Sequence, residues 1–201
     1  MKKAFKIITP CYFAPISHWK EIVSGNIIWE LNLNYNKQSL RNRTYIYGAN
    51  KILNLSIPIK HHNNYFALKD ALIENNFQWQ KEHWKSIQSA YKSSPFFEFY
   101  EDGLKNLYFN NYNKLSDFNI DCIKLVYEWL DISTKLSFTK TFKEKYNNEI
   151  DLRDMAEKNF DDKFIVKEYI QVFSANHGFK NNLSILDLIF NQGSNSISFL
   201  K

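Results

Sequence analysis

The sequence predicts an α/β fold, with a βαβ sheet and a β-hairpin in residues 1–76 and a mainly helical half, residues 77–201, packed on them. Two observations support this prediction. Short apolar runs bounded by turn residues, as buried strands usually are, concentrate in the first part. Apolar residues spaced three and four apart, as on amphipathic helices, dominate the second part. Because no linker or low-complexity segment separates the two parts, we expect a single domain.

The order of elements in the first part is typical of a Rossmann-like sheet. Two apolar runs flank a short helical pattern within about 33 residues, the length of one βαβ unit, so we expect two parallel strands. The hairpin turns through Gly48, Ala49 and Asn50. The expected elements are a strand at residues 5–9, a helix at 18–23 with Ser17 as its N-cap, a strand at 27–33, hairpin strands at 43–47 and 53–57, and a short strand at 71–73.

The second part is expected to contain four helices. The first shows the pattern most plainly, because Trp79, His83 and Ile87 are four residues apart. Ser184 and Gly193 supply an N-cap and a C-terminal glycine to the last. The expected helices span residues 78–92, 96–109, 120–130 and 185–190; we also expect a strand at 136–138, helical segments at 151–158 and 167–173, and a final turn at 196–200.

A polar and cationic stretch, residues 34–59, stands out because core packing does not explain it. Arg41 and Arg43 are two apart, so in an extended strand their side chains share one face. Only three of the 26 Lys and Arg residues are arginine, and a planar guanidinium binds phosphate or carboxylate with paired hydrogen bonds, as Lys cannot. The pattern predicts an anion clamp. The other interpretation is a charged edge strand that prevents edge-to-edge pairing.

The composition limits the class of protein. The net charge of +5 permits an anionic partner, but the lysines are scattered among Asp and Glu, so we expect no nucleic-acid partner other than an aminoacyl donor. The two cysteines form no CxxC pair, and we find neither a signal peptide nor an apolar run of the roughly 18 residues that span a membrane. These features predict a cytoplasmic protein. The spacing of His and Cys predicts no metal site, and no cofactor is expected.

Histidines and one cysteine are the candidate catalytic groups. His18 lies where the first strand is followed by a helix, at the edge where open α/β sheets bind ligands. His177 precedes Gly178 in a turn and is expected to be exposed; the alternative is a structural turn histidine. His83, on an apolar helix stripe, fits a core or groove histidine. Cys11 is a possible nucleophile, although a small thiol in a buried turn more often serves packing.

The turn YFAPISH at residues 12–18 is faintly similar to the F-x-P-x-H-x-G-H turn of the nucleotidylyltransferase superfamily. The two histidines of that motif fall on Ser17 and Lys20 of this chain, and its glycine falls on Trp19. The groups that stabilise charge in adenylyl transfer are therefore absent, and the similarity supports the architecture alone.

Four blocks in order resemble the WbqC-like protein family nearly from end to end. They are TPCYFAPISHW, NYNKQSLRNRTYI followed by LSIPIK, WQKEHWKSIQSAYKSSPFFEFY, and HGFKNNLSILDLIFNQG. The positions that carry the resemblance are Pro10, Tyr12, Phe13 and Pro15 in the first block, Arg41, Asn42 and Arg43 in the second, and Tyr91, Lys92 and Pro95 in the third. Ser17 and His18 stand where Leu-Gly is frequent in the family.

The resemblance implies a role in the biosynthesis of bacterial surface polysaccharides, such as O-antigen, or of related products. The leading hypothesis that it suggests is the transfer of a glycyl or other acyl group to an amino sugar or nucleotide-sugar, with an anionic small molecule as substrate. His18 or His177 would accept the proton of the attacking amine. The candidate ligand-binding residues are Tyr12, Asn34, Tyr35, Lys37, Arg41, Asn42, Arg43 and His83.

Two other hypotheses follow from the residues. One is an adenylating enzyme, similar to nucleotidylyltransferases, which requires a phosphate site near Ser17. The other is a binding or scaffold protein without enzymatic activity that uses the aromatic helices of residues 79–100 as a partner surface. Burial of Trp79 and Trp84 would count against the second.

Overall fold

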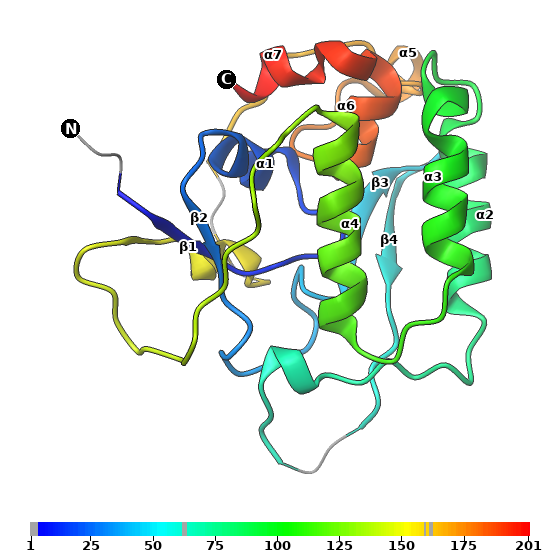
Figure 1. Cartoon of the computed structure of the whole chain (residues 1–201). Helices are drawn as coiled ribbons and strands as arrows, with labels where there is room; N and C mark the ends of the chain where they lie inside the picture. Colours follow the sequence, from blue (N-terminus) through cyan, green and yellow to red (C-terminus); the bar gives the residue numbers. More distant parts are fainter. Residues whose placement is uncertain (1–3, 62–63, 159, 161–162) are drawn as a thin grey trace.

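The computed structural model describes residues 4–61, 64–158, 160 and 163–201. It confirms the mixed α/β class: a small parallel sheet and a hairpin are built mainly from the N-terminal part, and most of the helices follow them along the chain (Figure 1).

The N-terminal βαβ unit is confirmed. Strand β1 (Lys6–Ile8) pairs in parallel with β2 (Ile27–Trp29), and helix α1 (Ile16–Val23) connects them. The cap of α1 differs from the prediction, because Pro15 holds the N-cap position and Ser17 lies inside the first turn. Proline suits the start of a helix, since no N–H of the first turn has a partner within the helix.

A third strand, β5 (Ile150–Asp151), lies on the other side of β1. It is parallel to β1, and the sheet order is β2-β1-β5. The helix expected at residues 151–158 is wrong. Its first residue belongs to β5, and the residues after it form only a 3-10 turn, η2 (Arg153–Ala156). Pairing with β1 decides this outcome: the amide of Ile150 donates to the Phe5 carbonyl and that of Leu152 to the Ile7 carbonyl, both at 2.8 Å.

The hairpin is confirmed as a separate two-stranded sheet. Strands β3 (Arg43–Tyr47) and β4 (Ile52–Ser56) are antiparallel, with Tyr45 opposite Asn54. Gly48 is required at the turn, because a Cβ there would lie 2.6 Å from the Leu53 side chain.

Residues 34–42 do not extend the hairpin strand, and the expected strand face with Arg41 and Arg43 in register is wrong. The segment forms tight turns instead. The Ser39 hydroxyl donates to the Asn36 carbonyl at 2.8 Å, and the Asn42 amide donates to the Ser39 carbonyl at 3.3 Å. These turns direct Arg41 into the interior, where its side chain has no exposed surface.

Three helices in the middle of the chain pack on one another in order, and the first of them also packs on strand β3 of the hairpin. They are α2 (Trp79–Tyr91), α3 (Phe97–Phe109) and α4 (Leu115–Trp129). The first two agree with prediction. Helix α4 begins five residues before the expected start at residue 120. Its first turn is anchored by a hydrogen bond from the backbone amide of Leu115 to the Ala71 carbonyl at 2.9 Å.

The short elements between and after these helices complete the fold. The 3-10 turn η1 (Leu68–Asp70) precedes α2; α5 (Ser174–His177), α6 (Ile185–Gln192), η3 (Gly193–Asn195) and α7 (Ser196–Leu200) end the chain. The helices α6 and α7 lie against α1 (Figure 1). Ser184 caps α6 as predicted. Single bridges, Trp29 with Phe138 and Ile59 with Ile73, stand where short strands were expected.

The helical segment expected at residues 167–173 is wrong, because the chain runs there without regular structure. The side chain of Gln171 holds this segment against another part of the chain. It donates to the Lys180 carbonyl at 3.0 Å and accepts from the backbone amide of Lys180 at 2.8 Å.

A buried polar junction at Asp187 joins four parts of the chain. Its carboxylate accepts hydrogen bonds from the hydroxyls of Tyr91 and Tyr169, at 2.9 and 2.6 Å, and from the Gln171 amide at 2.8 Å. The Tyr91 hydroxyl in turn accepts from the amide of Tyr47 on β3 at 3.0 Å. Helices α2 and α6, the hairpin and residues 169–171 are thereby fixed together.

One cluster of buried apolar residues draws on both parts of the chain, from Ile8 in β1 to Leu200 in α7. Burial of these side chains is the main favourable term for folding. Among the described residues, no helix is both long and apolar enough to cross a membrane.

Candidate functional site

The most distinctive place in the fold is the carboxyl edge of the three-stranded sheet between β1 and β5. The chain leaves β1 through Thr9 and crosses by α1 to β2 on one side, whereas β5 lies on the other side. The carboxyl ends of β1 and β5 therefore flank a change in sheet order, where open α/β sheets bind ligands. The loop after β1, the turn η2 after β5, and the segment of residues 34–42 meet at this edge.

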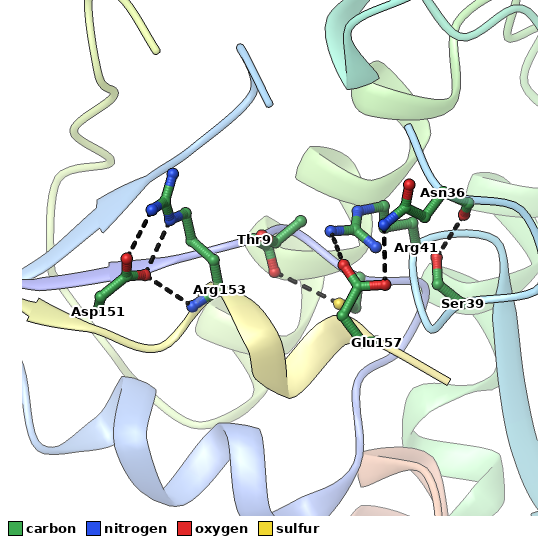
Figure 2. A network of polar contacts seen from close by, with 8 residues as sticks. Thr9, Asn36, Ser39, Arg41, Asp151, Arg153 and Glu157 are labelled. Atoms are coloured by element: carbon green, nitrogen blue, oxygen red, sulfur yellow. Dashed lines mark hydrogen bonds and ion pairs between the residues drawn. The ribbon is translucent and has the colours of Figure 1, made fainter. Parts of the chain in front are cut away.

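Arg41 is the central charged group of this edge. Its Nη2 donates to Oε1 of Glu157 at 2.7 Å, and the other carboxylate oxygen accepts from the side-chain amide of Asn36 at 3.0 Å (Figure 2). Arg41 is completely buried, while the Glu157 side chain is 33% exposed. Among the described residues, neither Nε nor Nη1 of Arg41 has a hydrogen-bond partner.

Backbone and amide contacts hold Arg41 in position. The amide of Leu40 donates to the Ala156 carbonyl at 2.9 Å, which ties the segment to η2. The amide of Tyr12 donates to the Leu40 carbonyl at 3.1 Å, which ties it to the loop after β1. The side-chain amide of Asn119, on α4, donates to the carbonyl of Arg41 at 2.8 Å. The guanidinium is thus presented by a rigid frame.

The charge of Arg41 acts on its titratable neighbours. Burial raises the pKa of the Cys11 thiol to about 12, against the effect of Arg41. Burial also raises the pKa of Tyr35 to about 12, while Arg41 and Arg43 act to lower it. Burial favours a higher pKa for Glu157 as well, but hydrogen bonds from Arg41 and Asn36 outweigh it and hold the pKa below its usual value. At neutral pH, Cys11 is a protonated thiol and Glu157 a carboxylate.

Two neighbouring cavities lie at this edge and share Met155 and Phe160 in their walls. The smaller, of about 180 Å³, is also lined by Ser39, Leu40, Glu157 and Asn182. The larger, of about 400 Å³, lies between α1 and η2 and is lined by Ser17, Lys20, Glu21, Asp154 and Phe164 among others. Glu157 therefore both lines the smaller cavity and contacts the buried guanidinium of Arg41.

The model of the WbqC-like protein family matches residues 10–165. The chain belongs to the WbqC-like protein family. A relative, "Uncharacterized protein Rv1507c" of Mycobacterium tuberculosis (strain ATCC 25618 / H37Rv), is 21% identical over an alignment of 200 residues that covers 85% of each protein. No solved structure matches the chain. In this WbqC-like protein, Arg41, Glu157, Asn36 and Asn119 all lie within the matched range.

The structure brings together only some of the ligand-binding residues proposed from the sequence. Arg41, Arg43 and Tyr35 lie close enough for both arginines to act on the pKa of the tyrosine. Asn34 and Lys37 are exposed nearby in the chain. Asn42 has a contact within the fold, because its side-chain amide donates to the Ile57 carbonyl at 2.9 Å.

Tyr12 and His83 belong to a different buried cluster of this WbqC-like protein. Nδ1 of His83 is 2.9 Å from the Tyr12 hydroxyl, which also hydrogen-bonds to that of Tyr108. Burial lowers the pKa of His83 to about 4, so the ring is neutral at pH 7. The cluster links the loop after β1 to α2 and α3.

The two proposed catalytic histidines differ in their exposure to solvent. His18, on α1, is 1% exposed and follows Ser17, which lines the larger cavity. His177 is exposed, as predicted, and its Nε2 lies 2.9 Å from the Ala49 carbonyl at the hairpin turn. Neither is among the described residues that line the two cavities.

Sequence reasoning missed Glu157, Asn36 and Asn119. Glu157 falls in a segment expected to be helical, and its approach to Arg41 depends on the position of β5 in the sheet. A carboxylate just after a strand at the change in sheet order is the signal that would have found it, but that signal requires the sheet order. Among the described residues, no group of three or more His, Cys, Asp and Glu side chains is placed to hold a metal ion.

The third arginine, Arg153, was also missed, and its surroundings differ from those of Arg41. It donates to both carboxylate oxygens of Asp151, at 2.8 and 2.6 Å, and to the carbonyls of Lys143 and Glu144, at 2.8 and 3.0 Å. Its guanidinium also lies 4.9 Å from the ring centre of Tyr146. Figure 2 shows Arg153 and Asp151 apart from Arg41 and Glu157. Arg153 fixes the loop that precedes β5.

Proposed function

We propose that this WbqC-like protein is an enzyme that binds a phosphorylated or nucleotide-linked amino sugar at Arg41 and transfers an acyl or aminoacyl group to its amine. The observation that supports the anion site is Arg41 itself. It is completely buried beside a cavity at the change in sheet order, and its Nε and Nη1 have no hydrogen-bond partner among the residues that the structure describes. The family's proposed place in surface polysaccharide biosynthesis supplies the class of acceptor.

Nε and Nη1 of Arg41 are buried donors without an acceptor among the described residues, and this makes a bound ligand energetically favourable. A buried donor without an acceptor costs about 1–3 kcal/mol, and more when it is charged. Native proteins rarely leave such groups in their interior, so each of them requires an explanation. An anionic ligand that accepts from these donors supplies one, and the rigid frame around Arg41 orients the ligand before it binds.

The proposed reaction is an amide-forming transfer. The nitrogen of the amino sugar attacks the carbonyl carbon of the acyl donor, a C–N bond forms, the leaving group departs with its electron pair, and a base accepts the proton of the nitrogen. His18 and His177 are the proposed bases. Neither histidine lines the described cavities, so the geometry does not choose between them. Turnover by the His18→Gln and His177→Gln variants identifies the base: its loss lowers the rate of turnover and leaves substrate affinity unchanged.

The anion site is tested by thermal denaturation of the full chain with UDP-N-acetylglucosamine, UDP, CTP and ATP. A ligand that binds the folded state alone raises the melting temperature by mass action. We expect at least one uridine nucleotide to stabilise the wild-type chain and Arg41→Met to lose that shift. Lys145→Met removes an exposed charge elsewhere and serves as the control. An Arg41→Met variant with the wild-type shift would contradict the proposal.

The second hypothesis from the sequence, an adenylating enzyme, has one observation in its favour. Ser17 lines the larger cavity at the first turn of α1, where a phosphate site is required. Stabilisation by ATP alone in the same panel would favour it. The third hypothesis, a partner surface on the aromatic helices, loses support because Trp79 and Trp84 are only 3% and 6% exposed.

A further inference from the structure

We propose that Glu157 is an internal substitute for a tetrahedral oxyanion, such as the phosphate of the substrate, and that this oxyanion displaces Glu157 from Arg41 when it binds. The inference rests on the proposed function, because it concerns the same anion site. It adds the chemical class of the group that Arg41 accepts and a residue that competes with it.

The contacts of Glu157 show what kind of group fits. One oxygen accepts from Arg41 Nη2 and the other from the Asn36 side-chain amide, at 2.7 and 3.0 Å. A planar carboxylate has two oxygens, and both are engaged, while Nε and Nη1 of Arg41 have no partner in the described ranges of the chain. A phosphate monoester has three terminal oxygens, and the diphosphate of a nucleotide-linked sugar has four non-bridging oxygens, so either group can make both contacts of Glu157 and accept from a further N–H of Arg41.

The difference in burial decides which member of the ion pair moves. Arg41 has no exposed surface, and its segment is tied to η2, to the loop after β1 and to Asn119. Glu157 is one-third exposed at the wall of the smaller cavity, so its carboxylate can be solvated once it leaves. A buried guanidinium is strongly destabilised without a counter-ion. The incoming anion therefore replaces Glu157 in one exchange step, and Glu157 does not leave Arg41 before the anion arrives.

The alternative is that Glu157 is a permanent partner that holds Arg41 in place for the ligand. The two roles predict opposite signs for the same substitution. Glu157→Gln keeps the size of the side chain and a carbonyl acceptor for Arg41, but removes the negative charge that competes with an anion. A displaced carboxylate predicts tighter anion binding by this variant, whereas a permanent positioning partner predicts equal or weaker binding.

The experiment is isothermal titration of the full chain with inorganic phosphate, sulfate and acetate at pH 7. It compares the wild type with Glu157→Gln, Arg41→Met and the control Glu168→Gln, which removes one exposed carboxylate of the same size. We expect Glu157→Gln to bind phosphate about fivefold more tightly than the wild type, since a partly exposed ion pair contributes about 1 kcal/mol and a tenfold change requires about 1.4 kcal/mol. We expect Glu168→Gln to match the wild type and acetate to bind more weakly than phosphate.

Three outcomes are decisive. Equal or weaker phosphate binding by Glu157→Gln, together with lost binding by Arg41→Met, would overturn the displacement and leave the anion site of the proposed function intact. Wild-type phosphate binding by Arg41→Met would overturn both. Acetate that binds Glu157→Gln as tightly as phosphate does would overturn the assignment of a tetrahedral oxyanion.

A second variant keeps the inference testable if Glu157→Gln does not fold. Glu157→Asp retains the charge, but its side chain is one methylene shorter and withdraws the carboxylate from Arg41 Nη2. Phosphate then meets a weaker competitor. We expect phosphate to raise the melting temperature of Glu157→Asp more than that of the wild type, and an equal or smaller rise would overturn the displacement.

Discussion

Arg41 and Asp187 are both ionisable side chains in the interior, yet the protein surrounds them in opposite ways. The carboxylate of Asp187 accepts from three donors that belong to separate segments. Within the described part of the chain, Nη2 is the guanidinium nitrogen of Arg41 that has a partner, and this partner, Glu157, reaches solvent. A buried ionisable group that several segments share through hydrogen bonds serves the fold, whereas one with unpartnered donors beside a cavity is organised for a ligand.

The largest effect that this comparison predicts is on Asp187→Ala. The substitution removes the acceptor of the Tyr91 and Tyr169 hydroxyls and of one N–H of the Gln171 side-chain amide, which keeps its hydrogen bond to the Lys180 carbonyl. We expect the free energy of unfolding to fall by about 4 kcal/mol, measured by urea denaturation. Asp102→Ala, which removes an exposed carboxylate from α3, should change it by less than about 0.5 kcal/mol. A similar small loss for Asp187→Ala would show that the junction is dispensable.

The cluster of His83, Tyr12 and Tyr108 predicts a dependence of stability on pH. The pKa of His83 is about 4 in the folded protein and 6.5 for the free side chain. Between these values the unfolded state binds more protons, so stability is complete above pH 6.5 and is lost as pH falls toward 4. We expect this residue to account for about 3 kcal/mol, because one pKa unit corresponds to about 1.4 kcal/mol.

His83→Gln removes this titration and keeps a polar group beside the Tyr12 hydroxyl. Urea denaturation at a series of pH values from 7 to 4 should therefore give a flatter profile for the variant than for the wild type. Parallel profiles would show that His83 is not the group responsible.

Arg41→Met sharpens the comparison from the other side, because it should affect binding far more than stability. The substitution removes two unpartnered donors and frees a carboxylate that is already one-third exposed. We expect the free energy of unfolding to change by less than about 1 kcal/mol while phosphate affinity falls about 100-fold. Urea denaturation and titration calorimetry measure the two quantities. A loss of stability as large as that of Asp187→Ala would assign Arg41 to the fold.

The smallest effect is expected for Lys37→Met. Lys37 is exposed, so it attracts an anion only through solvent and its influence is screened by salt. We expect phosphate affinity to fall less than about threefold at low ionic strength and to equal that of the wild type at about 0.5 M salt. A larger loss that persists in salt would place Lys37 in direct contact with the ligand.

Local patterns were sufficient to predict the parts of the fold that depend on neighbouring residues. Pro10 follows the first strand, Gly25 with a φ of +88° ends α1, and alternating residues define the hairpin. Strand β5 could not be found in this way. Its two residues carry no period of their own, and they are extended only because β1 offers them a free edge.

The candidate site was predictable in its residue type and unpredictable in its geometry. The rarity of arginine directs attention to Arg41, but the expected exposed strand face is wrong because turns around Asn36 and Ser39 redirect the chain. The partner of Arg41 lies 116 residues further along the sequence. No local pattern can connect two positions at that separation.

The same separation has a consequence for biosynthesis. Residues 43–56 can pair as a hairpin as soon as they leave the ribosome, because the hairpin joins neighbours. Strand β5 and Glu157 are synthesised much later. A nascent chain that stops before residue 150 therefore carries an open edge on β1 and an arginine without its counter-ion, so this part of the protein becomes native only when three-quarters of the polypeptide has been made.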